Sequence, residues 1–166
     1  MVAQLDDALD KAVRIARELE AAKLPYAIGG ALAYGRYGIP RATHDVDVNA
    51  FVDASRLGEV IAALERSGVV LDAARAERHS ADEGMFIGHL DGMRIDVFMP
   101  SIDFSWEAMR TRVRLPVGDE QFWFLSAEAL SVFKLLFFRG KDIVDLERLV
   151  AVYGAKMDLA YVRRQI

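Results

Sequence analysis

Residues 45 to 52 read DVDVNAFV, an alternation of polar and apolar side chains that is typical of a strand with one buried face. With a period of two, Asp45, Asp47 and Asn49 project from one face, while the residues between them project from the other. Two carboxylates held this close repel each other unless one is protonated or a cation neutralises them. A hard divalent ion such as Mg²⁺, which prefers oxygen ligands, is the natural partner. The alternative is a strand whose acidic face simply meets water.

A third carboxylate follows in another predicted strand. Residues 85 to 98 contain two strand-like runs joined by an Asp-Gly dipeptide, which is typical of a tight hairpin. Asp96 lies in the middle of the second run among apolar residues, where an unpaired charge is costly. With the other two carboxylates it would complete a two-metal site. The alternative is a surface position or a salt bridge with Arg94.

A glycine pair precedes the acidic strand. Residues 24 to 28 predict a short buried strand, residues 31 to 34 open a helix, and Gly29 and Gly30 form the turn between them. Glycines at such a turn let backbone N–H groups approach a phosphate, and the start of the helix attracts anions. Taken alone, such a pair is more often only a tight turn.

A lysine interrupts an apolar helix nearer the C-terminus. Residues 129 to 138 read ALSVFKLLFF, and the ammonium of Lys134 in such a helix needs a partner or a route to water. Either Lys134 reaches a nucleotide phosphate, or its chain extends to solvent while Asp142 caps the next helix. The charged residues that follow directly are Arg139, Lys141, Asp142 and Asp145.

The overall pattern predicts an α/β (α+β) fold, a small mixed β-sheet flanked by helices with a helical C-terminal part. The chain has 166 residues, 53% of them hydrophobic, which suits one domain with a core at about 24–125 and C-terminal helices at about 126–166. The expected strands are residues 24–28, 45–52, 85–90, 93–98 and one or two within 111–125. The expected helices are residues 4–22, 31–38, 56–66, 126–138, 141–153 and 157–165.

Composition limits the kinds of site and the cellular location that we expect for the protein. The chain has no cysteine, so disulfides and thiolate metal sites are excluded. Its formal net charge of −4 gives no overall attraction to nucleic acid, although basic residues could still gather at the entrance of the active site. The N-terminal stretch is charged and amphipathic, and no uncharged run is long enough to span a bilayer. We therefore expect a cytoplasmic protein that does not bind membranes.

The stretch from residue 26 to residue 48 resembles the DNA polymerase β-like nucleotidyltransferase superfamily, in which a Gly-Gly or Gly-Ser turn leads through a helix to an Asp-x-Asp strand. Residues 38 to 47 read Gly-x-Pro-Arg-x-Thr-x-Asp-x-Asp, which is most similar to the minimal bacterial branch that includes the AbiEii-type toxins. The string Lys-x4-Arg-x-Lys-Asp-x2-Asp at residues 134 to 145 is similar to the C-terminal motif of that branch. The gap between glycines and aspartates is long for the superfamily, and the turn at residues 35 to 40 could absorb it.

This resemblance implies a magnesium-dependent transfer of a nucleoside monophosphate from a nucleoside triphosphate to an acceptor hydroxyl, with release of pyrophosphate. It assigns the metal and the catalysis to Asp45, Asp47 and Asp96, with Mn²⁺ as the alternative ion. Arg41 and Thr43 either contact phosphate or stabilise the loop before the aspartates. The full predicted nucleotide-binding set is Gly29, Gly30, Arg41, Thr43, Lys134, Lys141 and Asp142.

The acceptor stays open at this point. An RNA end, a protein hydroxyl and a small molecule such as an aminoglycoside are all compatible with the sequence, and the first is not favoured by an acidic chain. The branch also suggests a toxin–antitoxin or resistance component, with an antitoxin-like protein as a partner. The competing hypothesis is a catalytically silent nucleotide-binding or regulatory module with the same fold. The presence of three carboxylates argues against lost catalysis.

Overall fold

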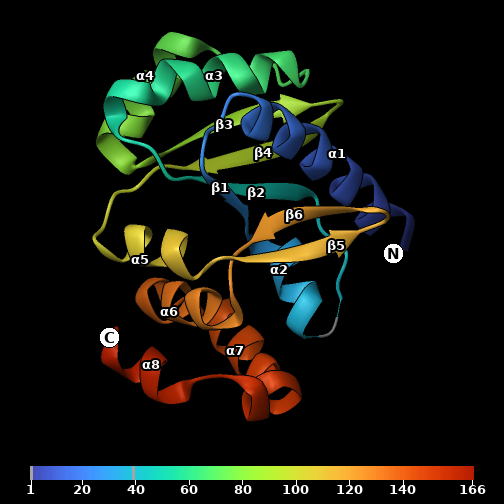
Figure 1. Ribbon diagram of the computed structural model, residues 1–166, viewed down its shortest axis with the longest axis vertical. Helices are drawn as coiled ribbons and strands as arrows, with labels where there is room; N and C mark the ends of the chain where they lie inside the picture. Colours follow the sequence, from blue (N-terminus) through green and yellow to red (C-terminus); the bar gives the residue numbers. More distant parts are fainter. Residues whose placement is uncertain (1, 39) are drawn as a thin grey trace.

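A computed structural model of the chain describes residues 2–38 and 40–166. Ile39, which belongs to the motif before the aspartates, lies outside the described residues. Within them the strands form one mixed sheet in the order β3-β4-β2-β1-β6-β5 (Figure 1). The strands are β1 (Tyr26–Ile28), β2 (Asp45–Ala50), β3 (Met85–Leu90), β4 (Met93–Phe98), β5 (Val113–Val117) and β6 (Glu120–Phe124).

Helices cover both faces of the sheet. Helix α1 packs against α3 and β2, whereas α2 packs against β2 and α6, and α6 also contacts α7 and α8 (Figure 1). Asp47 of β2 lies on the side of α2 and α6, because it contacts Gly30 at the start of α2 and lines a cavity with Lys134 of α6. The α-helices are α1 (Val2–Ala21), α2 (Gly30–Tyr37), α3 (Leu57–Arg66), α4 (Ala73–Glu83), α5 (Phe104–Thr111), α6 (Ala127–Phe137), α7 (Gly140–Tyr153) and α8 (Leu159–Arg164). Two short 3-10 turns are η1 (Ala54–Arg56) and η2 (Gly154–Lys156).

The predicted fold class is confirmed, and most predicted elements lie within a few residues of the observed ones. Among the strands, two predicted boundaries are wrong by two residues. The acidic strand ends at Ala50 rather than at residue 52, and the first strand begins at Tyr26 rather than at residue 24. Phe51 still donates its backbone N–H to Pro25, but no ladder continues beyond it. The polar–apolar alternation continues in the sequence to residue 52, but the neighbouring strand β1 pairs with β2 only as far as Ala50.

Helices α4 and α5 were not predicted. The α4 sequence AARAERHSADE buries only Ala76, so it shows no apolar stripe from which periodicity could be read. Its ends carry local signals instead. The Asp72 carboxylate accepts a hydrogen bond from the backbone N–H of Arg75, and Gly84 ends the helix with φ +69. These short-range bonds specify α4 without much help from the core.

Strand β2 has the predicted two-sided character. Val46, Val48 and Ala50 are each no more than 1% exposed and belong to the hydrophobic core, whereas Asp45 and Asp47 are only half-buried. The buried side chains hold the strand in register, and a slip of one residue would bury the carboxylates in their place. The apolar half of the alternation thus fixes where the acidic half points.

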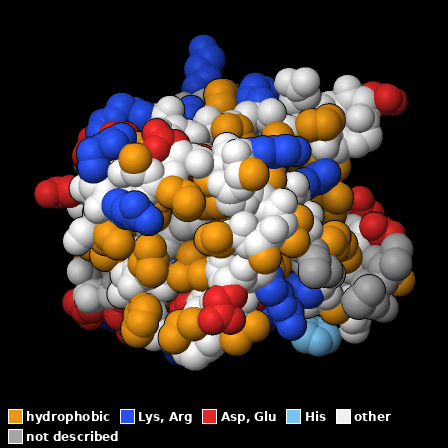
Figure 2. Space-filling view, turned by 90° about the horizontal axis from the view of Figure 1, so that it is seen from below, with side chains coloured by type: hydrophobic (Ala, Val, Ile, Leu, Met, Phe, Trp, Pro, Cys, Tyr) orange, Lys and Arg blue, Asp and Glu red, His pale blue; other side chains and the backbone are white. Residues whose placement is uncertain are grey.

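The C-terminal helices present an unusually apolar outer surface. Figure 2 looks at the molecule from below, where these helices lie in Figure 1, and hydrophobic side chains gather across the middle of this face. A groove of about 600 Å³ runs between α6, α7 and α8, with Leu146, Val150 and Leu159 among its lining residues. In the described part of the chain, no helix combines the length and the apolar composition needed to cross a bilayer.

Candidate active site

Strand register brings two of the predicted carboxylates face to face. Strands β2 and β4 pair in parallel, and Asp47 lies directly opposite Asp96. Asp45 is opposite Arg94, two residues earlier on the same face. Because side chains opposite each other in neighbouring strands are about 5 Å apart at Cβ, one acidic cluster forms across the two strands. The sequence could place each aspartate on a strand, but only the sheet brings them together.

Gly30 packs directly onto the carboxylate of Asp47. A Cβ added to Gly30 would lie 2.5 Å from Cγ of Asp47 and closer still to its Oδ2, and Gly30 also has a φ of +50. The backbone N–H of Gly29 donates to the Asp47 carbonyl oxygen at 2.9 Å. Glycine is therefore required at the start of α2 by close approach and by backbone conformation together. The Gly29-Gly30 turn therefore positions Asp47 within the acidic cluster, in addition to any contact it makes with a phosphate.

The charged form of the Asp47 carboxyl group is disfavoured by its surroundings. Burial, followed by the negative charges of Asp45 and Asp96, raises the pKa of Asp47 from its ordinary 3.8 to about 7, against smaller opposing effects of Lys141 and Arg139. Raised carboxyl pKa values of this kind are common where burial and like charges converge at functional sites. Arg94 is the one cation in direct contact with the three carboxylates among the described residues, so the cluster keeps an excess of negative charge that a divalent cation would neutralise.

The outer two carboxylates are engaged with their neighbours. The Thr43 hydroxyl lies 2.6 Å from Oδ1 of Asp45 and 3.1 Å from its carbonyl oxygen, and Arg94 Nε donates to Oδ1 of Asp96 at 2.6 Å. Across the described residues, no three Asp, Glu, His or Cys side chains are turned together as a ready metal site. Asp45 and Asp96 would have to rotate inward from Thr43 and Arg94. With that rotation the three carboxylates fit a cation in number, in spacing across the strands and in charge.

The C-terminal cluster is a buried ion network between α6 and α7. Lys134 Nζ lies 2.7 Å from Oδ2 of Asp145 and 3.6 Å from Oδ1 of Asp142. Arg139 Nε donates to Oδ2 of Asp142 at 2.7 Å, and the Arg139 backbone N–H donates to the same oxygen at 3.1 Å. Burial would raise the pKa of Asp142, but the bonds and charges of Arg139 and Lys134 outweigh it and hold that pKa low.

The network contradicts two predictions from the sequence, namely that Lys134 extends to solvent and that Asp142 is the N-cap residue of the next helix. Lys134 does not extend to solvent, because its side chain is 13% exposed and is paired with acids. Asp142 is not the cap residue of α7; it lies in the first turn and bonds back to Arg139, the residue at the cap position. Asp142 and Asp145 are 1% and 4% exposed, so their charges depend on these partners.

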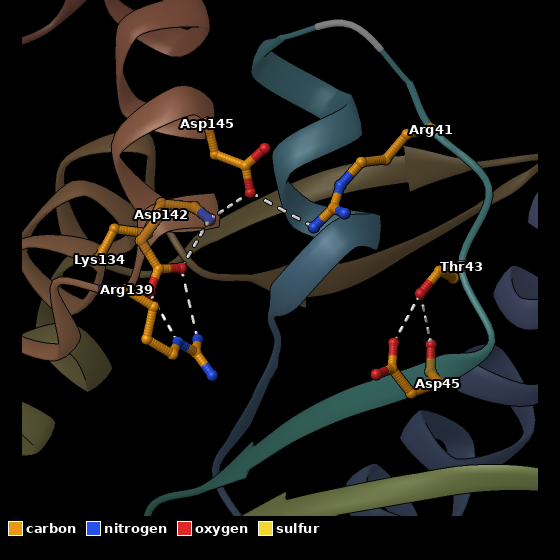
Figure 3. Close-up of polar contacts among 7 residues, drawn as sticks. All are labelled: Arg41, Thr43, Asp45, Lys134, Arg139, Asp142 and Asp145. Carbon is orange, nitrogen blue, oxygen red and sulfur yellow. Dashed lines mark hydrogen bonds and ion pairs between the residues drawn. The ribbon is translucent and has the colours of Figure 1, made fainter.

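Arg41 connects the network to the acidic strand. Figure 3 shows its guanidinium extending from the segment before β2 toward Asp145 on α7, and Arg41 Nη2 lies 3.3 Å from Asp145 Oδ2. Thr43 and Asp45 follow on the same segment (Figure 3). Arg41 and Thr43 thus make the contacts expected for loop stabilisation. Nε of Arg41 and the hydroxyl of Tyr34 are buried without a hydrogen-bond partner among the described residues.

Replacement of Lys134 by methionine is expected to destabilise the protein by about 3 kcal/mol, because it leaves two nearly inaccessible carboxylates without their ammonium partner. The free energy of unfolding in urea measures the loss. The matched control is Arg56→Met, which breaks an exposed ion pair with Glu59 and should cost much less, because water screens that pair. Equal losses in the two variants would contradict the buried network as described.

A cavity of about 350 Å³ joins the acidic strand to this network. Gly30, Asp47 and Asn49 are among its lining residues, and so are Lys134, Arg139 and Asp142. The segments that provide these residues are far apart in the sequence, and the packing of α6 against α2 brings them to one place. Its size lies within the range of small-molecule sites.

The cavity is lined by four of the predicted site residues, which are Gly30, Asp47, Lys134 and Asp142, and the other predicted residues do not line it. Asp45 and Asp96 flank Asp47, and Lys141 is exposed near enough for its charge to lower the pKa of Asp47 slightly. Sequence reasoning did not assign a role to Asn49, whose Nδ2 would lie 2.8 Å from a Cβ added to Gly29. The period of two that selected the aspartates also put Asn49 on their face, so a signal for it was present.

The chain matches no family model and no curated protein, but it is similar in fold to several solved structures. The antibiotic-resistance factor ANT(2'')-Ia in solution is 16% identical over 98% of this chain and 90% of that chain, with a TM-score of 0.65. The lincosamide antibiotic adenylyltransferase LnuA is 18% identical over 86% and 96%, with a TM-score of 0.58. TM1012 of Thermotoga maritima, named a nucleotidyltransferase, is 17% identical over 88% and 94%, with a TM-score of 0.62. This chain shares the fold of these nucleotidyltransferases.

Proposed function

We propose that the protein transfers a nucleoside monophosphate from a nucleoside triphosphate to an acceptor hydroxyl. The observation that carries this proposal is the pairing of Asp47 with Asp96 across β2 and β4. Asp47 also lies against Gly30 and lines a cavity that Lys134 lines as well. Phosphoryl-type transfer depends mainly on positioning and on charge neutralisation, and these residues provide both. The shared fold with antibiotic nucleotidyltransferases supports the same reaction class.

In this proposal Asp45, Asp47 and Asp96 hold Mg²⁺, with Mn²⁺ as the alternative. A bound divalent ion would neutralise charge on the phosphates and favour ionisation of the acceptor hydroxyl. The raised pKa of Asp47 supports the assignment, because the cluster is short of positive charge. Metal binding would also compete with the bonds of Asp45 to Thr43 and of Asp96 to Arg94.

Other residues of the site bind the triphosphate, and a carboxylate accepts the proton of the acceptor hydroxyl. The Gly29-Gly30 turn and the first N–H groups of α2 face the phosphates, and Lys134 and Lys141 supply positive charge. The acceptor oxygen attacks the α-phosphorus, the bond to the β-phosphate oxygen breaks, and pyrophosphate leaves. An acid of the cluster takes the hydroxyl proton.

A small-molecule acceptor is the best supported class. LnuA has been seen with lincomycin, and ANT(2'')-Ia with adenylylated tobramycin. A net charge of −4 gives RNA no general attraction. A resistance role is the natural extension of this class. Membership of the AbiEii-type branch, a toxin–antitoxin role with a protein partner, a cytoplasmic location and a silent regulatory module stay predictions from the sequence.

Labelled transfer tests the proposal. The chain is incubated with each α-labelled nucleoside triphosphate and Mg²⁺ or Mn²⁺, in separate reactions with small hydroxyl compounds, total RNA and a protein extract. Label on an acceptor together with pyrophosphate release is the expected result, and Asp45→Asn should remove both. Asp53→Asn, an exposed acid outside the cluster, is the matched control and should keep full activity. Transfer that survives Asp45→Asn would show that the assigned site is wrong.

A further inference from the structure

We propose that the acceptor of this protein has an apolar, uncharged body attached to its hydroxyl, and that this body lies in a slot between α6 and residues 98–105. The inference rests on the proposed function and specifies its substrate class. The slot is the part of the 350 Å³ cavity that extends from Asp47 past the two walls described next. An acceptor must bring its hydroxyl to Asp47, so the rest of the molecule meets these walls.

Both walls of the slot are apolar. Phe98, Met99 and Ile102 form one wall at the end of β4 and just after it, and Leu130, Phe133 and Phe137 form the other along α6. The α6 residues recur at intervals of three and four, which puts them on one helix face. Ile102 and Phe137 are 43% and 57% exposed, so they stand at the mouth. An apolar group entering here would be removed from water on two sides.

The aromatic side chains of α6 are held in place by neighbours. The Phe133 ring meets the Phe104 ring edge-on at 5.1 Å between centroids, and it stacks with Phe137 at 6.5 Å with 19° between the ring planes. Such contacts restrict the rings before any ligand arrives. A preformed apolar wall lowers the ordering cost of binding, which favours rigid apolar ligands.

The charges in the slot disfavour a polycation. The lining carboxylates are Asp47, which belongs to the reaction centre, and Asp142, which is 1% exposed and is bonded to Arg139. Lys134 and Arg139 add positive charge to the same lining. A molecule with several ammonium groups would therefore meet cations and apolar rings, and it would lose hydration without gaining carboxylate partners.

A nucleobase would fit the walls less well than an apolar acceptor body. The edge of a base carries donors and acceptors that need partners when it is buried. The slot offers the hydroxyls of Ser101 and Ser105 beside its apolar residues, and neither stands on the α6 wall. The apolar walls match a body with few polar atoms.

The test measures binding of alkyl glucosides by calorimetry, below the concentration at which they form micelles. Methyl, hexyl and octyl glucoside share one sugar and differ only in the chain that would enter the slot. The expected result is that the dissociation constant falls by up to about fourfold for each added CH₂. Binding should persist with saturating Mg²⁺ and a non-hydrolysable nucleoside triphosphate. Tobramycin, a hydroxyl compound with several ammonium groups, should bind more weakly than octyl glucoside.

A charge reversal at the mouth locates the binding. Ile102→Glu should weaken octyl glucoside at least tenfold and strengthen tobramycin. Val152→Glu, at an exposed apolar position outside the slot, should change neither. No dependence on chain length, tighter binding of tobramycin by the unchanged chain, or no effect of Ile102→Glu would overturn the proposal. Loss of glucoside binding with the triphosphate present would assign the slot to the nucleobase. Absence of nucleotide transfer alone would count against the proposed function, since the binding readout needs no turnover.

Discussion

Asp47→Asn is expected to abolish nucleotide transfer, lowering its rate by roughly a thousandfold or more. The substitution keeps the shape of the side chain but removes the negative charge that lies at the centre of the acidic cluster, opposite Asp96 and against Gly30. Without this charge the cluster loses a central cation ligand. Initial rates of pyrophosphate release with saturating substrates measure the effect.

The same substitution is expected to stabilise the metal-free protein at alkaline pH. The pKa of Asp47 is raised from 3.8 to about 7 on folding, so the folded state binds this proton more tightly than the unfolded state. The contribution of Asp47 to stability is fully present below about pH 4 and is lost as pH rises through about 7. The loss amounts to at most about 4 kcal/mol, at 1.4 kcal/mol for each pKa unit. Asparagine, neutral throughout, avoids it.

Urea unfolding in a chelating buffer at pH 5.5 and pH 8.5 measures this effect. The gain of Asp47→Asn over the unchanged chain should be larger at the higher pH, and Asp53→Asn should show no such gain. Addition of Mg²⁺ at the higher pH should stabilise the unchanged chain but not Asp47→Asn, because the metal relieves a charge that the variant lacks. If Asp47→Asn were less stable than the unchanged chain at pH 8.5, the pKa of Asp47 would not be raised on folding.

Gly30→Ala is expected to lower transfer by about a hundredfold and to destabilise the fold by more than about 2 kcal/mol. Its added Cβ would overlap the Asp47 carboxylate and would hold an L-residue at a φ of +50. Either Asp47 turns away from Asp96 or the start of α2 moves, and both outcomes disturb the reaction centre. Steady-state rates and urea unfolding at one pH give the two quantities.

Gly118→Ala separates the two causes. Gly118 has a similar φ of +59, but a Cβ there would meet no atom within 4 Å. This variant should lose about 1 kcal/mol from backbone conformation alone and should keep its transfer activity. If Gly30→Ala behaved like Gly118→Ala, the contact between Gly30 and Asp47 would have no functional importance.

Much of the fold could be predicted because its signals are local. The Asp91-Gly92 turn and the alternating runs around it specify β3 and β4 at the predicted residues, since side-chain period and turn conformation are set by near neighbours. Helix α4 could not be predicted in the same way, because Ala76 is its one buried residue and the rest faces water. A solvent-covered helix leaves no periodic pattern.

The C-terminal cluster shows where residue patterns leave a choice open. Lys134 was expected either to reach phosphate or to extend to solvent. It does not extend to solvent, because it pairs with Asp142 and Asp145, and it lines the cavity in which the phosphate role stays a proposal. Partners eight and eleven residues away can be recognised as candidates in the sequence. Whether they meet depends on the angle between α6 and α7, which no local pattern specifies.

The sequence by itself determined that Asp45 and Asp47 share one face of a strand, that a glycine turn precedes them, and that Asp96 lies in a later strand. These properties follow from the two-residue period of strands and from the conformations that glycine allows. Only the tertiary structure decided that Asp47 faces Asp96, that Gly30 touches Asp47, and that apolar walls extend from them. Strand order and helix packing arise from burial of the whole core at once, so they lie beyond any local pattern.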